Sequence, residues 1–250
     1  LDNNIPTHIV AIGVSAGGLE ALESFFNAVD DDLGCAYIVI QHLSPDFKSM
    51  MDQLLSKYTA MPIFQAKNGQ KIEANKVFLV PAGTLLRIVD GHVALSELPK
   101  ENRISLPINA IFTNLAVDAQ MGLVGIILSG TGSDGCRGIV ALKEMGALVI
   151  AQDPTEAQFN GMPQNAIGTG AVDFVLKTEE MPEYIKNYVS HPLASAESET
   201  FKYHLSQNTD VLRKILILIQ DNTGLDFKAY KESTVSRRIK HRISINNMVS

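Results

Sequence analysis

Short apolar runs that alternate with amphipathic stretches constrain the fold of this 250-residue chain more than any other feature. Six runs within the first 177 residues are rich in β-branched and aliphatic side chains and have no polar face. Strands of this kind have helices over both of their faces. The predicted strands are His8 to Gly13, Cys35 to His42, Val77 to Val80, Leu123 to Ser129, Ala147 to Asp153 and Ala171 to Lys177.

Helical patterns fill the intervals between these runs. Apolar residues recur every three or four positions from Leu19, Met50, Ile108 and Ile139. Alternating strand and helix predicts an α/β fold, with a doubly wound, mostly parallel sheet and helices on both faces. One β-hairpin interrupts the alternation, and its strands, residues 85–89 and 92–95, are joined by an Asp-Gly turn.

The chain is expected to contain two modules. Residues 1–190 are predicted to form the α/β domain, closed by a helix that carries Pro182 in its first turn. Residues 191–204 are predicted as a linker because the stretch SHPLASAESET is small, polar and Pro-containing. Residues 205–250 are then predicted to form a short all-α segment, with one helix from Leu205 to Gln220 and a basic helix from about Lys231 to Ile245.

Charge divides along the same boundary. Residues 201–250 hold nine Lys and Arg against four Asp and Glu, a balance of +5; the whole chain carries −6, so the first 200 residues carry −11. The acidic first module disfavours binding to duplex DNA, and no nucleic-acid partner is expected. The basic segment is expected to meet an acidic partner.

The composition also bounds the cellular setting. No apolar run reaches the ~20 residues that cross a bilayer, and no signal peptide precedes the first strand. Cys35 and Cys136 are too few for a disulfide framework or a structural zinc site, and both are expected to be reduced thiols. We therefore expect a cytoplasmic protein without membrane insertion, bound metal or other cofactor.

A Gly-rich loop follows the first predicted strand and precedes the first helix. It reads Gly13-Val14-Ser15-Ala16-Gly17-Gly18 and fits the G-x-S-x-G pattern of a nucleophile elbow. At such a turn the Ser15 hydroxyl points out of the sheet, near the positive end of the helix. The same glycines also fit a nucleotide cradle, in which backbone N–H groups bind phosphate and Ser15 is incidental. The loop alone does not decide between these two interpretations.

A serine hydroxyl needs a base, and His42 is the histidine that follows an apolar strand at its carboxyl end. Asp134 follows another apolar strand, in a Gly-rich turn, and its carboxylate could orient the imidazole. Asp in that place also commonly caps the next helix. The same turn offers backbone N–H groups, that of Thr131 among them, to a developing oxyanion. The order Ser, His, Asp differs from the Ser, Asp, His order of α/β-hydrolases, so that class is rejected.

Four motifs, in family order, resemble the catalytic domain of CheB-type chemotaxis methylesterases. They are IGVSAGGLEAL, VIQHLSPDFKSMMDQLL, VFLVPAGTLLRI and ILSGTGSDGCRGIVALKEMGALVIAQDPTEAQFNGMPQNAI, which lie within residues 8–190. The resemblance implies a serine hydrolase that demethylates glutamate γ-methyl esters on the cytoplasmic helices of chemoreceptors. It also implies that some members deamidate receptor glutamines, and that the triad is Ser15, His42 and Asp134.

The resemblance further implies supporting roles around that triad. Backbone N–H groups of Ala16 and Thr131 would hold the oxyanion, and Gly17, Gly132 and Met162 would line the cleft. Three residues depart from the family pattern, and none of them belongs to the triad: Ala16 stands where Thr is frequent, Thr131 where Met is common, and Asn109 where Asp is usual.

The alternative function is a non-catalytic nucleotide- or receptor-binding module that uses loop 13–18 as an anion cradle. A dinucleotide cradle is supported by an acidic residue about twenty positions further on. Asp30, Asp31 and Asp32 lie in that region, but before the second predicted strand rather than at its end. Their position weakens the alternative.

The basic segment has a resemblance of its own. The stretch ILIQDNTGLDFKAYKESTVSRRIKHRI resembles the opening of the N-terminal helical domain of CheR-type receptor methyltransferases. The resemblance implies that Arg237, Arg238, Lys240 and Arg242 form a positive face toward an acidic receptor or cofactor. The S-adenosylmethionine-binding domain of that family is not in this sequence, so neither methyl transfer nor that cofactor is expected.

Overall fold

The computed structural model describes residues 4–41, 51–98, 106–118, 121–191, 209–227 and 230–246, and the structural statements that follow concern these residues. The strands of the main sheet are β1 (His8–Val14), β2 (Cys35–Gln41), β3 (Ile63–Gln65), β4 (Lys76–Leu79), β7 (Gly122–Ile127), β8 (Leu148–Gln152) and β9 (Phe174–Leu176). The helices are α1 (Gly18–Ala28), α2 (Met51–Leu55), α3 (Pro107–Asp118), α4 (Cys136–Glu144), α5 (Gly161–Gly168), α6 (Met181–Ser190), α8 (Thr209–Thr223) and α9 (Glu232–Ile245).

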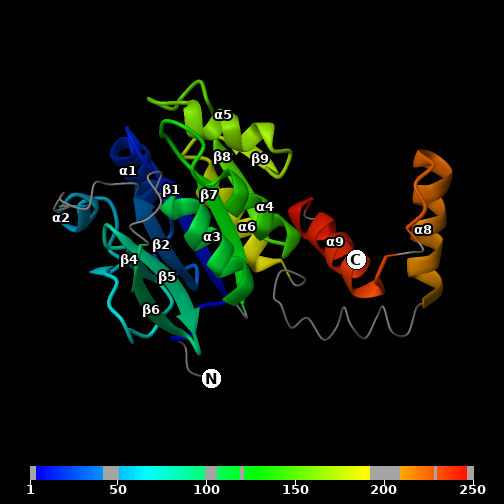
Figure 1. Cartoon of the computed structure of the whole chain (residues 1–250), viewed down its shortest axis with the longest axis horizontal. Helices are drawn as coiled ribbons and strands as arrows, with labels where there is room; N and C mark the ends of the chain where they lie inside the picture. The colour runs from blue at the N-terminus through cyan, green and yellow to red at the C-terminus, as the bar shows by residue number, and fades with distance from the viewer. Residues whose placement is uncertain are drawn as a thin grey trace.

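The main sheet confirms the predicted α/β fold. Its strands run in the order β3-β4-β2-β1-β7-β8-β9, and every neighbouring pair is parallel (Figure 1). The strand β3 was not predicted, because its three residues follow Pro62 and are too few to show a periodic pattern. Predicted strand 171–177 shortens to β9, since the pairing with β8 begins only at Phe174, after the turn at Gly170 (φ +72°).

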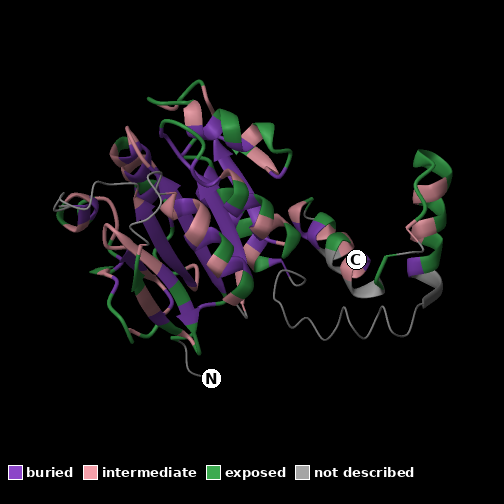
Figure 2. Ribbon diagram, in the orientation of Figure 1, coloured by how far each residue is buried: buried purple, intermediate pink, exposed green. Residues whose placement is uncertain are grey.

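Two hydrophobic cores lie on opposite faces of the sheet. All seven residues of β1 are buried, and alternate ones enter alternate cores because successive side chains point to opposite faces. Ile9 and Ala11 pack with α3, α4, α5 and the hairpin, whereas Val10, Ile12 and Val14 pack with α1, α2 and α6. Figure 2 shows the central strands as continuously buried. This two-sided burial explains the apolar runs of the sequence.

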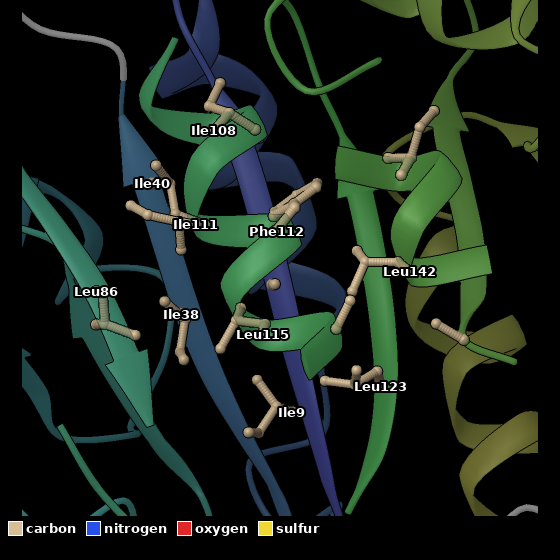
Figure 3. Close-up of a cluster of buried hydrophobic side chains, with 14 of the residues drawn as sticks. Ile9, Ile38, Ile40, Leu86, Ile108, Ile111, Phe112, Leu115, Leu123 and Leu142 are labelled. Atoms are coloured by element: carbon tan, nitrogen blue, oxygen red, sulfur yellow. The ribbon is translucent and has the colours of Figure 1, made fainter. Parts of the chain in front are cut away.

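The helix α3 lies across the first core. Figure 3 shows its residues Ile108, Ile111, Phe112 and Leu115 directed at the sheet, toward strand residues such as Ile38. These positions are spaced as one face of a helix, and all four side chains have 0% exposure. Full burial of one such side chain is worth about 1.5–3 kcal/mol, so α3 is held firmly against this face of the sheet.

The predicted hairpin is confirmed, with strands β5 (Thr84–Val89) and β6 (His92–Glu97). Val89 pairs with His92, so the loop is the two residues Asp90 (φ 49°) and Gly91 (φ 73°). Positive φ at both positions is the type I′ turn that Asp-Gly favours.

The last helix, α9, packs on the carboxyl end of α4, and it is the predicted basic helix. His241, 8% exposed, lies with Nδ1 3.1 Å from the Gly146 carbonyl and Nε2 3.2 Å from the Asp173 carboxylate. Lys143 also pairs with Asp173, and its Nζ lies 2.8 Å from His241 Nε2. Cations are favourable at the carbonyl end of a helix, which suits a basic helix to this place.

The helix predicted to end at Gln220 continues as α8 to Thr223, and Gly224 (φ 72°) follows it. Its predicted start at Leu205 and most of the predicted linker lie outside the described residues. No helix within the described ranges is long and apolar enough to span a membrane.

Candidate active site

The direction in which successive strands are added to the sheet reverses at β1, in the centre of the sheet. Successive strands are added on the β2 side first and then, from β7 onward, on the opposite side. In open parallel sheets, ligands bind beyond the carboxyl ends of the strands at this reversal. Ser15 directly follows β1, and the loop that contains Asp134 follows β7. The fold therefore brings two of the predicted catalytic segments to the place where such sheets bind ligands.

Ser15 sits at a sharp turn between β1 and α1. The ladder between β1 and β7 continues into the loop, where the Ser15 N–H donates to the Ser129 carbonyl at 3.0 Å. Gly17 then adopts φ +66°, and the chain enters α1. A Cβ at Gly17 would overlap the side chain of Gln158 and lie 2.8 Å from Ser129 Oγ. The turn therefore requires glycine both for its conformation and for space.

The peptide after Ser15 is oriented by a hydrogen bond. The Gly18 N–H donates to the Ser15 carbonyl at 3.0 Å, and no peptide bond of the described chain is cis. In a trans peptide the C=O and N–H point in opposite directions, so the Ala16 N–H points away from Gly18. Within the described part of the chain, neither the Ala16 N–H nor the Thr131 N–H donates a hydrogen bond. Both groups are therefore available to an oxyanion.

Asp134 is 2% exposed and lies against the first turn of α3. Its Oδ2 accepts from the Ile108 N–H at 3.1 Å, and its Oδ1 accepts from the Asn109 N–H at 2.9 Å. The positive end of a helix stabilises an ionised carboxylate. The residue at the N-cap position of α4 is Gly135, and the N–H groups of Arg137 and Gly138 in the first turn of α4 donate to Asn109 Oδ1 rather than to Asp134. The alternative that Asp134 caps its own following helix is therefore wrong, since it caps α3 across the fold.

The loop before α5 packs beside the Ser15 turn. The Gly130 N–H donates to the Phe159 carbonyl at 2.9 Å, and the Met162 N–H donates to the Gly130 carbonyl at 2.8 Å. Met162 is fully buried, and a Cβ at Gly130 would overlap its Sδ and lie 2.9 Å from Ser15 Cβ. Met162, Gly130 and Ser15 are thus packed together without spare room.

The remaining predicted cleft residue, Gly132, is exposed with φ +80°, and its carbonyl accepts from Asn165 Nδ2 at 2.8 Å. Thr131 is exposed as well. Gly17 and Gly132 thus lie in the loops that follow β1 and β7, at one edge of the sheet.

His42 lies outside the described residues. The strand that leads to it is described, and its last residue, Gln41, pairs with Val14 of β1. Ser15 and His42 are the next residues along the chain after this pair.

Other candidate chemistry is absent or disfavoured in the described ranges. Burial, followed by the nearby charge of Asp134, raises the pKa of the Cys136 thiol, which therefore stays protonated and weakly nucleophilic. No group of three His, Cys, Asp or Glu side chains is placed to hold a metal ion among residues 4–41, 51–98, 106–118, 121–191, 209–227 and 230–246. A cavity of about 300 Å³ lies instead beside Lys143, Gly146 and His241, where α9 meets α4.

Two residues of this region were not singled out from the sequence. Ser129 and Gln152, both nearly or fully buried, lie at the carboxyl ends of β7 and β8, and the Ser129 N–H donates to Gln152 Oε1 at 2.8 Å. A polar residue at the end of an otherwise apolar strand was the signal that could have identified them.

Two family models match separate parts of the chain. The model of the CheB methylesterase family matches residues 10–185, and that of the CheR methyltransferase all-alpha domain matches residues 210–250. The crystal structure of the Thermotoga maritima CheB methylesterase catalytic domain has a TM-score of 0.66 and 26% sequence identity. The match covers 71% of this chain and 96% of that structure.

Relatives in sequence agree with this assignment. A protein-glutamate methylesterase/protein-glutamine glutaminase of Paramagnetospirillum magneticum is 34% identical over 69% of this chain and 49% of its own length. An uncharacterized 104.1 kDa protein of Rhodobacter capsulatus is 34% identical over 79% of this chain and 23% of its own length. This chain thus spans about half of the methylesterase and under a quarter of the larger protein. With the seven-stranded sheet and the family match over residues 10–185, the chain belongs to the CheB methylesterase family.

Proposed function

We propose that this chain is a serine hydrolase that removes methyl groups from glutamate γ-methyl esters of chemoreceptors in chemotaxis adaptation. Deamidation of particular receptor glutamines is a second reaction of the same site, and the paired name of the methylesterase relatives supports it. The observation that carries the proposal is the Ser15 turn at the switch point, hydrogen-bonded to the loop that holds buried Asp134.

The proposed triad is Ser15, His42 and Asp134. His42 follows Gln41, the register partner of Val14, and this backbone relationship supports a base next to Ser15. Asp134 has both carboxylate oxygens bonded to N–H groups of α3, so its position is fixed and its charge is stabilised. A fixed carboxylate orients the imidazole and stabilises the imidazolium.

The reaction follows in two steps. His42 takes the proton of the Ser15 hydroxyl as Oγ attacks the γ-carbonyl carbon, and the N–H groups of Ala16 and Thr131 hold the oxyanion. The tetrahedral intermediate expels methoxide, which leaves as methanol after it receives the proton from His42. Water then gives a proton to His42 and attacks the acyl-serine, and the products are the glutamate carboxylate and free Ser15. With glutamine, ammonia leaves in place of methanol.

These steps require a hydroxyl, an imidazole, a carboxylate and water, so we propose that the reaction uses no cofactor. The proposed partners are the cytoplasmic helices of methyl-accepting chemoreceptors, which places the protein in the cytoplasm. We assign no nucleic-acid partner, because the first 200 residues carry an excess of negative charge. Residues 210–250 supply a basic helical segment related to receptor methyltransferases.

Methanol release from a methylated receptor tests the proposal. The wild-type chain is expected to release methanol, and the Ser15→Ala and His42→Ala variants are expected to lose the activity by a factor of about 10⁴ or more. Ser133→Ala is the matched control, since Ser133 is exposed in the neighbouring turn and belongs to no proposed role. Equal activity of Ser15→Ala and the wild type would contradict the proposal.

The runner-up function, an anion cradle without catalysis, predicts a different outcome. A cradle would raise the melting temperature of the chain in the presence of nucleotide, and receptor esters would stay intact. The structure gives loop 13–18 another use for its backbone, since the Ser15 and Gly18 N–H groups donate to Ser129 and Ser15 carbonyls rather than facing solvent. This observation favours the hydrolase.

A further inference from the structure

A network of hydrogen-bonded polar side chains is connected to the Ser15 turn, and the proposed reaction does not use it. Its members are Ser129, Gln152, Glu156, Thr178 and Ser24. Gln152 is the last residue of β8, Ser24 lies on α1, and the other three follow β7, β8 and β9. Ser129, Gln152 and Thr178 have exposures of 0%, 3% and 1%. Buried polar groups are costly unless they are bonded, so a chain of them points to a specific role.

Ser129 is the centre of this network. Its carbonyl accepts from the Ser15 N–H at 3.0 Å, and its Oγ donates to the Ala16 carbonyl at 2.8 Å. The same Oγ accepts from the Phe159 N–H at 3.0 Å. Ser129 therefore binds the backbone N–H of the proposed nucleophile and the carbonyl of the residue after it, and it also binds the loop before α5.

Gln152 connects Ser129 to a carboxylate. Its Oε1 accepts from the Ser129 N–H at 2.8 Å, and its Nε2 donates to Glu156 Oε2 at 2.9 Å. A backbone N–H only donates and an ionised carboxylate only accepts, so the orientation of the amide is fixed by its neighbours. An acceptor and a donor are needed at once, which a hydrocarbon side chain cannot supply.

Glu156 connects the network to α1 through Thr178. It accepts from the Thr178 N–H at 3.0 Å and from the Thr178 hydroxyl at 3.0 Å. Thr178 Oγ1 lies 2.9 Å from Ser24 Oγ. The network therefore contacts the Ser15 turn through Ser129 and contacts α1 through Ser24. Since α1 begins directly after the Ser15 turn, both ends of the network support the same segment.

We propose that Ser129, Gln152 and Glu156 are positioning residues for the Ser15 nucleophile. They contact neither substrate nor water in the reaction, and they act through the backbone of Ser15 and Ala16. The network fixes where the Ser15 hydroxyl and the Ala16 N–H lie relative to the substrate carbonyl. This inference rests on the proposed esterase function and adds the elements that align its nucleophile.

The variant Gln152→Glu gives the sharpest test. A protonated Glu has one acceptor and one donor in the arrangement of the Gln amide, whereas an ionised Glu faces the Glu156 carboxylate and lacks the donor. We expect burial and the neighbouring Glu156 carboxylate to favour the protonated form of the new carboxyl at the acidic end of the assay range. The ratio of kcat for Gln152→Glu to kcat for the wild type is measured from pH 5 to pH 8.5 on methylated receptor.

The expected ratio falls to about 0.1 at high pH, because one buried hydrogen bond is lost, and it returns toward 1 as the pH is lowered. KM is expected to stay within about twofold, since the network does not contact substrate. Gln152→Leu is expected to show a reduced kcat at every pH. Gln164→Glu is the matched control, because Gln164 is exposed on α5, and its ratio is expected to stay near 1 throughout.

A merely structural network would give a different result. It would lower the melting temperature of Gln152→Glu and leave kcat per active site, counted by titration with a fluorophosphonate, equal to that of the wild type at every pH. That outcome would overturn the inference. A fall in kcat/KM that comes from a higher KM, with kcat unchanged, would also overturn it. The Gln152→Glu measurement suffices if Gln152→Leu does not fold.

The experiment also separates this inference from the proposed function. A wild-type chain that reacts with the fluorophosphonate but leaves receptor esters intact would reject the substrate alone, and the labelling rates of the variants would then decide the role of the network. A wild-type chain that neither releases methanol nor reacts would reject both.

Discussion

Asp134 and Asn109 exchange helix caps. The Asp134 carboxylate accepts the N–H groups of Ile108 and Asn109 in the first turn of α3, at 3.1 and 2.9 Å. Asn109 Oδ1 in turn accepts the N–H groups of Arg137 and Gly138 in the first turn of α4, at 2.8 and 3.0 Å. Asp134 thus caps α3, the helix that contains Asn109, and Asn109 caps α4, the helix that begins just after Asp134. These four hydrogen bonds hold the two helices together beside the proposed active site.

The exchange predicts a separation of stability from activity at Asn109. Asn109→Ala removes the acceptor for α4 but keeps the backbone N–H that binds Asp134. Loss of a helix cap costs about 1 kcal/mol, so the urea midpoint is expected to fall while kcat changes by less than about threefold. Asn27→Ala, on the exposed side of α1, is the matched control. An unchanged midpoint for Asn109→Ala would refute the capping role.

Asp134→Asn tests the orienting carboxylate. The amide is close to the carboxylate in shape, but it offers one acceptor oxygen instead of two and carries no charge for an imidazolium. We expect kcat on methylated receptor to fall on the order of 10³–10⁴-fold, with a chain that remains folded by circular dichroism. A loss of less than tenfold in a folded chain would remove Asp134 from the triad.

Close packing at Gly130 predicts that one added methyl group disables the site. In Gly130→Ala the new Cβ overlaps Met162 Sδ and lies 2.9 Å from Ser15 Cβ, so the Ser15 turn or α5 has to move. Overpacking of this kind costs about 1–3 kcal/mol. We expect a lower melting temperature together with a kcat at least tenfold below that of the wild type.

Gly168→Ala is the control for that variant. A Cβ at Gly168 would meet no atom within 4 Å, and alanine is the better helix former at the end of α5. Its melting temperature is therefore expected to be equal to or higher than that of the wild type. Equal behaviour of the two alanine variants would contradict the packing described around Ser15.

The contact of α9 with the α/β domain predicts a pH dependence of stability. Burial alone would raise the pKa of Asp173, but hydrogen bonds from His241 and Lys143 bring it below its usual value. A lowered pKa in the folded state stabilises the protein above the unfolded pKa, about 3.9, and that stabilisation is lost as the pH falls through the folded pKa.

The corresponding experiment compares urea unfolding of the wild type and Asp173→Asn at several pH values. At pH 7 the wild type is expected to be more stable by about 2 kcal/mol, the value of a hydrogen bond to a charged group. The difference is expected to shrink below pH 4. A difference that stays constant from pH 7 to pH 3 would show that the charge of Asp173 does not contribute.

Much of the fold was predictable because burial on two faces leaves a direct trace in the sequence. The strand from His8 and the strand from Cys35 read as unbroken apolar runs, and both are fully covered by helices, apart from Gln41 at the end of the second. The Asp90-Gly91 turn was equally readable, since few residue pairs accept positive φ at both positions. The strand β3 was missed because its order comes from pairing with β4 and not from its own pattern.

The candidate site was only partly predictable. Ser15 and Asp134 could be selected because each follows an apolar strand in a Gly-rich turn. The contacts that support them could not, because they join residues far apart in sequence, such as Ser129 and Ala16, which are 113 positions apart. The same limitation explains why Asp134 was considered as a cap for its own helix, when its partners lie on α3, 25 and 26 positions before it.

Covalent labelling tests the central claim most directly. The intact chain is treated with a serine-directed fluorophosphonate, and the modified peptide is identified by mass spectrometry. We expect one adduct per chain, on Ser15, and we expect labelling to be lost in His42→Ala and preserved in Ser133→Ala. An adduct on another serine, or labelling at an equal rate when Ser15 is alanine, would contradict the assignment of Ser15 as an activated nucleophile.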